Sequence, residues 1–232
     1  MRKIFVVLLI VFFSLPFTVK AQTTELWGGY ISTVKINERF SIWNDWHYVT
    51  DAFFASRHGL TYNLHRYALV SAGYAYVTTA TPFTNDFVRD ENRIWWQVVG
   101  RQNITNNISY RYRWRHDLRY RQALDGTEVS DLVRLNQRTR LLADFRFILK
   151  RLPNDRRIHF DVMNEFLYQW GRHMSPGVDQ NRFYLMGGYS TTNVTVLGGF
   201  SLRSIYSGPQ IRHQPGFTVW VIHSIRRRQE VM

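Results

Sequence analysis

Residues Arg111–Arg121, RYRWRHDLRYR, alternate between two kinds of side chain. Every odd position carries a charge, and every even position except His116 carries an aromatic ring or a leucine. Successive side chains of a β-strand point to opposite faces, so this order separates cleanly on a strand, whereas a helical stripe through the same residues would be half charged. The segment therefore predicts a strand with one charged face and one apolar face.

The same two-faced order recurs in the neighbouring segments 91–98, 133–147 and 158–170. The residues that we predict to form an ion network on the charged face are Arg93, Arg111, Arg113, Arg115, Asp117, Arg119, Arg134, Arg138, Arg140, Asp144, Arg146, Asp161, Glu165 and Arg182, joined by Asp45, Glu91 and Arg121. The residues that we predict on the apolar face, as lipid-facing or girdle side chains, are Trp46, Trp96, Tyr112, Trp114, Tyr120, Phe145, Phe160, Tyr168 and Trp170.

Alternation of this kind extends from about Leu26 to the end of the chain and divides into eleven candidate strands. Tight connections at 63–66, 103–107, 151–157 and 190–193 alternate with long polar segments at 79–90, 122–130, 171–180 and 206–216. Short turns at one end and long loops at the other are typical of outer-membrane β-barrels. Because bacterial single-chain barrels have even strand numbers, we expect ten or twelve strands, with Leu26–Val34 as the weakest candidate.

The charged face must be assigned either to water outside a soluble protein or to the inside of a barrel. A soluble antiparallel sheet also alternates, but it would leave more than a dozen arginines outside and would not need rings across its whole apolar face. In a bilayer a closed sheet pairs all its backbone groups, and an arginine facing lipid near the midplane costs ~2–4 kcal/mol. We therefore predict an all-β fold, a single antiparallel up-and-down transmembrane barrel with an arginine-rich polar lumen. Trp27 and Trp43 are expected in the aromatic belts, and Trp95 inside beside an arginine.

The first residues have the order of a secretory signal peptide, with a basic start, an apolar run and a cleavage site after Ala21. A membrane-spanning helix is the alternative, but Pro16 interrupts the run. We divide the chain into a signal peptide, 1–21, and a barrel domain, 22–232. Removal of the leader's three basic residues lowers the net charge from +13 to +10. Such a charge in an intracellular protein would indicate nucleic acid, but export argues against that partner. The chain has no cysteine, which excludes disulfides and cysteine-ligated metals.

Several segments carry a family resemblance when they are taken together in this order: ELWGGYIS (25–32), RFSIWNDWHY (39–48), GLTYNL (59–64), AGYAY (72–76), ENRIWWQ (91–97), NEF (164–166) and QNRFYLMGGY (180–189). They resemble an uncharacterised bacterial outer-membrane family of the domain-of-unknown-function 2490 type. The resemblance implies a β-barrel in the outer membrane of a Gram-negative bacterium, and it implies no activity, ligand or catalytic residue. The stretch QPGFTVWV (214–221) is similar to the last-strand signal that the barrel assembly machinery reads, so this machinery is an expected partner.

The sequence leaves the function open between two classes. The first is a structural or binding barrel, in which the arginine–acid network fills the lumen and the outer loops contact membrane lipid or lipopolysaccharide. The second is a narrow, porin-like channel that prefers small anions. A lipid-modifying enzyme is a third alternative, because Ser175 and His173 share one segment, but we expect no enzyme. His159 and Asp161 are expected to form a hydrogen-bonded pair in the lumen. The histidines show no zinc-binding spacing, and no metal or cofactor is expected.

Overall fold

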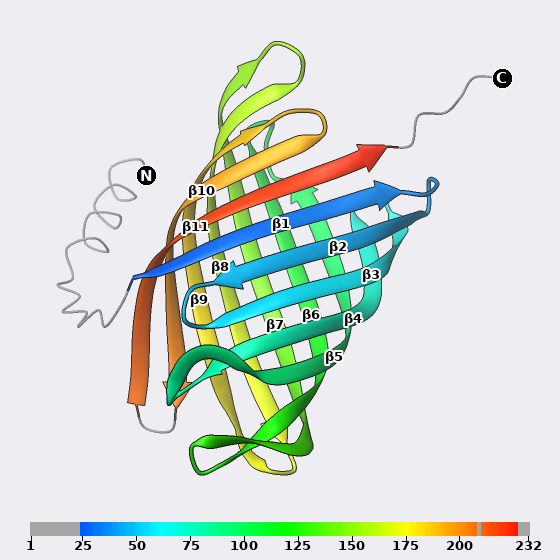
Figure 1. The fold of residues 1–232 in the computed structure, drawn as a ribbon. Coiled ribbons are helices and arrows are strands. Elements are labelled where there is room, and N and C mark those ends of the chain that lie inside the picture. The colour runs from blue at the N-terminus through cyan, green and yellow to red at the C-terminus, as the bar shows by residue number, and fades with distance from the viewer. Residues whose placement is uncertain (1–23, 208–209, 227–232) are drawn as a thin grey trace.

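The computed structural model describes residues 24–207 and 210–226 (Figure 1). The expected signal peptide and its cleavage site lie outside these residues. Within the described part of the chain, no helix is long and apolar enough to span a membrane. The strands are β1 (Glu25–Lys35), β2 (Phe40–Val49), β3 (Phe53–His65), β4 (Ala68–Thr81), β5 (Thr84–Asn103), β6 (Ile108–Asp125), β7 (Glu128–Leu152), β8 (Arg156–Gly171), β9 (Met174–Ser190), β10 (Val194–Ser207) and β11 (Gln210–Arg226).

The strands form one closed barrel in which each strand is antiparallel to its sequence neighbours. The barrel closes between β1 and β11, which run parallel in register from the pair Glu25 and Gly216 to the pair Lys35 and Arg226 (Figure 1). The all-β barrel predicted from the sequence is confirmed, but the expectation of ten or twelve strands is wrong. A parallel closure accepts an odd number, because the first and last strands then point in the same direction and neither edge is left unpaired.

Because β1 and β11 are parallel, the described chain begins at one mouth of the barrel and ends at the other. We call these the N-terminal mouth, where β1 starts, and the C-terminal mouth, where β11 ends. The turns 36–39, 66–67, 104–107, 153–155 and 191–193 lie at the C-terminal mouth. The turns 50–52, 82–83, 126–127 and 172–173 lie at the N-terminal mouth.

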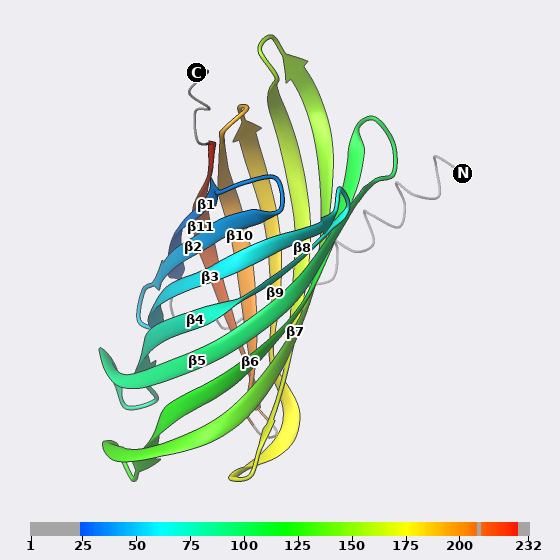
Figure 2. The same cartoon turned by 90° about the vertical axis from the view of Figure 1, so that its right-hand side faces the viewer.

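The long loops expected at the N-terminal mouth are replaced by extended hairpins (Figure 2). Residues 79–90, 122–130 and 171–180 continue the flanking strands, and each hairpin reverses in two residues. The segment 206–216 likewise belongs mostly to β10 and β11. Polar composition misled the prediction here, because a hairpin that projects beyond a barrel is polar on both faces and loses the alternation that marks a strand.

Residue parity along each strand separates the two faces of the barrel wall. Of the predicted lipid-facing residues, Trp96, Tyr112, Trp114, Tyr120, Phe145 and Tyr168 are exposed on the outer surface, and Trp46, Phe160 and Trp170 are partly exposed. Trp27 and Trp43, by contrast, lie inside, so the sequence-based assignment of these two rings to the belts was wrong. They share parity with the buried acids Glu25 and Asp45, which sets their direction.

Apolar packing occupies one side of the barrel interior. One cluster spans β1, β2, β8, β9 and β10 and consists of Trp27, Val49, Met163, Tyr184, Met186 and Leu197. A second cluster joins Ala55, Ala75, Val77 and Trp95 on β3 to β5. The remaining interior surface, mainly on β5 to β9, is available to the charged residues.

Candidate functional site

A large cavity occupies the interior of the barrel, with a volume of about 1590 Å³. Its lining reaches Asn106 and Arg151 at the C-terminal mouth and Pro82 and Tyr206 at the N-terminal mouth, so it extends between the two ends. Its arginines are Arg57, Arg66, Arg89, Arg93, Arg101, Arg111, Arg113, Arg119, Arg121, Arg138, Arg140, Arg146, Arg151, Arg157, Arg182, Arg203 and Arg212, and its acids are Asp45, Asp51, Asp144, Glu165 and Asp179.

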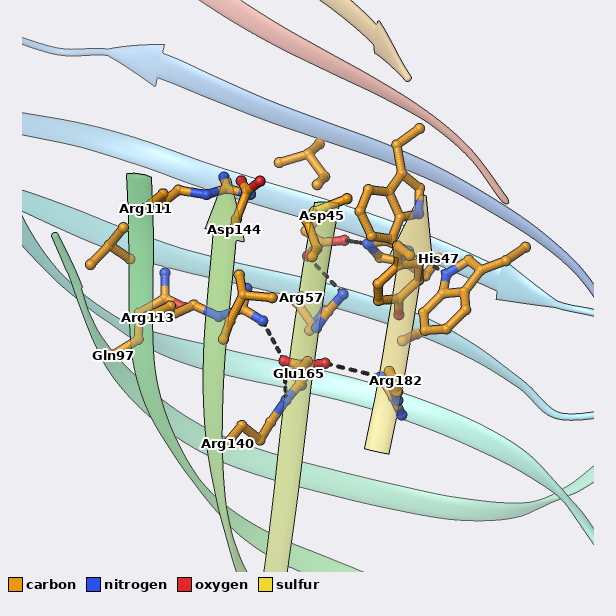
Figure 3. A pocket seen from close by; sticks show the side chains of 18 of the residues that line it. Asp45, His47, Arg57, Gln97, Arg111, Arg113, Arg140, Asp144, Glu165 and Arg182 are labelled. Carbon is orange, nitrogen blue, oxygen red and sulfur yellow. Dashed lines mark hydrogen bonds and ion pairs between the residues drawn. The ribbon is translucent and has the colours of Figure 1, made fainter. Parts of the chain in front are cut away.

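Glu165 on β8 is the centre of one charged cluster in this cavity (Figure 3). Arg140 donates to both carboxylate oxygens through Nε and Nη2, each over 2.9 Å. Arg113 Nη2 donates to Oε1 over 2.5 Å, and Arg182 Nη1 lies 3.5 Å from Oε2. One carboxylate therefore serves three guanidinium groups, and the cluster keeps a net positive charge.

Glu91 on β5, nearer the N-terminal mouth, is also a single carboxylate in contact with three arginines. Arg119 forms a bidentate pair with it, with Nε–Oε1 of 2.6 Å and Nη2–Oε2 of 2.9 Å. Arg93 Nε also donates to Oε1, and Arg121 Nε lies 3.5 Å from Oε2. Glu91 is completely buried and does not line the cavity, so its negative charge offsets the positive charge of these arginines without being exposed to the cavity. Bidentate arginine geometry holds the guanidinium planes in fixed orientations.

Asp117 on β6 lies between these two clusters. Arg115 Nε donates to its Oδ1 over 2.7 Å, and Arg138 Nη2 and Arg140 Nη1 lie 3.5 Å and 3.9 Å from Oδ2. The guanidinium of Arg115 also lies over the ring of Trp95, 4.4 Å from its centroid, so the predicted inward stacking of this tryptophan beside an arginine is confirmed.

Asp45 on β2 is the centre of a further charged cluster, on the side of the barrel opposite these strands. Arg57 Nη2 pairs with its Oδ2 over 2.7 Å, and His47 Nε2 lies 2.7 Å from Oδ1. The indole Nε1–H of Trp27 donates to His47 Nδ1 over 2.7 Å. An indole can only donate, so Nδ1 is the acceptor, and a neutral His47 imidazole carries its proton on Nε2.

The predicted ion network can be compared residue by residue with the structure. Sixteen of its seventeen members form ion pairs, and Arg134 forms none within the described residues. Sequence reasoning missed the Glu25–Arg203 pair and the contact between Asp179 and Arg138. Asp179 was assigned to a loop, and Glu25 precedes the first clear alternation.

The charges along the cavity do not balance. Seventeen arginines line it against five acids, and the buried carboxylates behind the wall, those of Glu25, Glu91, Asp117 and Asp161, still leave arginine in excess. The ion pairs lie along the wall of this cavity, and the expectation of a network that fills the lumen stays a prediction. Fixed positive charge in excess between low-dielectric walls gives the cavity a positive electrostatic potential.

The sequence raised two further kinds of site, a metal site and a serine–histidine pair. Within residues 24–207 and 210–226, no group of three or more His, Cys, Asp or Glu side chains is placed to hold a metal ion. Ser175 and His173, which the sequence brought together, form no hydrogen bond with each other in the described chain.

The fold and the cavity define the class of the protein: a closed β-barrel with an arginine-lined interior. The family described as "Protein of unknown function (DUF2490)" matches residues 24–207, and the chain belongs to this family, as its sequence motifs indicated. A comparison with curated proteins found no match.

A solved structure titled "Bacterial polysaccharide outer membrane secretin" has a similar fold, with a TM-score of 0.56 and 6% sequence identity. The match covers 78% of this chain and 63% of that chain, so this protein spans less than two thirds of its neighbour's length. At this identity the likeness concerns the fold alone.

Proposed function

We propose that this protein is a Gram-negative outer-membrane barrel that conducts small anions through its arginine-lined lumen. One observation carries the proposal: a cavity of about 1590 Å³ reaches both mouths and is lined by arginines that outnumber the acids. Fixed guanidinium groups raise the local concentration of anions and exclude cations, which is how rings of basic side chains select anions in pores. The polysaccharide secretin title of the similar barrel supports a transport role for such a fold.

The proposal also fixes an orientation. Outer-membrane barrels have short periplasmic turns and longer extracellular projections, so the extended hairpins at the N-terminal mouth would face outward. The exposed rings on the outer surface would contact membrane lipid and lipopolysaccharide, and the last strand would engage the barrel assembly machinery. The alternative is a closed structural barrel, in which thermal motion of the long arginine side chains blocks the open space.

Conductance of the purified protein in a planar bilayer tests the proposal. We expect steady ohmic currents, and in a KCl gradient we expect a reversal potential near that of chloride. Silence over many insertions would leave the closed structural barrel, and a potassium-like reversal potential would refute the assigned selectivity.

A pair of matched variants connects the selectivity to the cavity. Arg101→Glu reverses a charge on the cavity lining, and Lys150→Glu makes the same change at a residue outside that lining. The first variant should shift the reversal potential towards that of potassium, and the second should leave it unchanged. Equal shifts would show that the overall charge of the protein, rather than the lumen, sets the selectivity.

A further inference from the structure

A serine, a histidine and an aspartate form a hydrogen-bonded chain at the C-terminal mouth, apart from the clusters described above. Ser190 is the last residue of β9, and its Oγ lies 2.9 Å from His159 Nε2 on β8. His159 Nδ1 lies 2.8 Å from Asp161 Oδ1 on the same strand. His159 and Asp161 are fully enclosed, while Ser190 keeps 9% of its surface exposed.

The hydrogen bonds specify where the protons lie. Arg146 binds Asp161 through two contacts, Nε–Oδ1 of 2.9 Å and Nη2–Oδ2 of 2.7 Å, and an ionised carboxylate held in this way can only accept. The proton of the neutral His159 imidazole therefore sits on Nδ1, and Nε2 is an acceptor. The Ser190 hydroxyl must then donate to Nε2, and Thr195 Oγ1, 2.8 Å from Ser190 Oγ, donates to the serine oxygen.

The backbone around His159 is shaped to hold the ring in this orientation. Gly188 is its cross-strand partner on β9, and a Cβ atom added at Gly188 would lie 2.1 Å from His159 Cε1. Only a glycine lets the imidazole lie across β9 to reach Ser190. Arg146 fixes Asp161 from the other side. A nucleophile, a base and a residue that orients the base are thus all held by rigid strands.

Neighbouring residues place this serine beside the cavity. Ser190 pairs across the strands with Arg157 on one side and with Thr195 on the other, and Thr195 pairs in turn with Ile222. Arg157 and Ile222 both line the cavity, and Arg157 makes no ion pair within the described residues. A substrate at this mouth would therefore meet the free guanidinium of Arg157 on one flank of Ser190 and the Thr195 hydroxyl on the other, with the Ile222 side chain one strand beyond Thr195.

From this geometry we propose that Ser190 is the nucleophile of an esterase site that accepts carboxylic esters of anionic molecules. Ser190 Oγ forms a bond to the acyl carbon while His159 Nε2 takes the hydroxyl proton, and the carbonyl π electrons move onto oxygen. The oxyanion is stabilised by the Arg157 guanidinium. Collapse of this intermediate breaks the bond to the alcohol oxygen, which leaves with the proton from His159. Water from the lumen then hydrolyses the acyl-serine by the same two steps. The arginine-rich cavity favours substrates with a negative charge.

The chain contains a matched control for this proposal. Ser204 Oγ lies 2.9 Å from His213 Nδ1, but no carboxylate orients this second histidine within the described structure. If a serine–histidine contact alone were enough for reactivity, both serines would react. If the complete chain of three residues is required, only Ser190 would react.

A fluorophosphonate, which phosphonylates activated serines, tests the nucleophile on the folded full-length protein in detergent. We expect one label per chain, mapped to Ser190 by mass spectrometry, lost in Ser190→Ala and retained in Ser204→Ala. His159→Gln should slow labelling by ~10²–10⁴-fold, the usual contribution of a general base. Heat-modifiable migration on gels checks that each variant is a folded barrel. An unlabelled folded protein, or equal labelling of both serines, would overturn the proposal.

The substrate class is tested with two chromogenic esters. The anionic ester 4-nitrophenyl hemisuccinate should be hydrolysed faster than the neutral 4-nitrophenyl butyrate, and Arg157→Gln should remove that preference. Faster turnover of the neutral ester would refute the anionic substrate class. These outcomes are independent of anion conduction, because a sealed barrel can still hydrolyse an ester at its mouth and a conducting barrel can lack a reactive serine.

Discussion

Replacing Glu165 by glutamine removes the one carboxylate shared by Arg113, Arg140 and Arg182. The side chain is only 4% exposed, and its contacts with the three guanidinium groups are between 2.5 and 3.5 Å long. The substitution leaves Arg113 and Arg182 without an ion-pair partner and leaves Arg140 with only Asp117, 3.9 Å away. Removing one partner of a buried ion pair costs about 3–5 kcal/mol. We expect the free energy of unfolding to fall by that amount.

Guanidinium unfolding in detergent micelles, followed by tryptophan fluorescence, measures this loss. Asp131→Asn, at an exposed residue of β7, makes the same charge change and should alter the free energy of unfolding by less than ~0.5 kcal/mol. Adding Arg140→Gln to Glu165→Gln removes one of the cations that lost its carboxylate. The free energy of unfolding of the double variant should therefore fall by less than the sum of the decreases in the two single variants. Equal unfolding midpoints for Glu165→Gln and the wild type would refute the reasoning, because the arginines would then not depend on this carboxylate.

Two further predictions concern the barrel wall. Phe145→Arg puts a guanidinium on the outer surface, where the ring is 38% exposed, and should cost ~2–4 kcal/mol on unfolding from liposomes. The same change at Phe83, on a projecting hairpin turn, should cost far less, and equal losses would argue against lipid contact at Phe145. Gly73→Ala would place Cβ 2.0 Å from the carbonyl oxygen of His58, so we expect a loss of ~1–3 kcal/mol. The Cβ of Gly28→Ala would have no atom within 4 Å, so this variant should keep nearly the melting temperature of the wild type. Similar melting temperatures for the two alanine variants would contradict this difference in packing.

The direction in which each side chain points was already determined by the sequence over most of the barrel. Arg113 and Tyr112 lie on opposite faces because a strand alternates with period two, which is a local property of the backbone. The same rule could have placed Trp27 inside, since it shares parity with Glu25, but the large apolar ring was read as an outward one. The projecting hairpins escaped prediction because both of their faces meet water.

Only the tertiary structure decided how the strands close and which charges meet. Eleven strands close because β1 and β11 align in parallel, and that pairing joins residues at opposite ends of the chain. Glu165 binds Arg113, which lies 52 positions away in the sequence, and Ser190 contacts His159, which lies 31 positions away. Alternation assigns each of these residues to the inner face without saying which partner stands opposite. Register between strands sets that choice, and register depends on how the whole sheet closes.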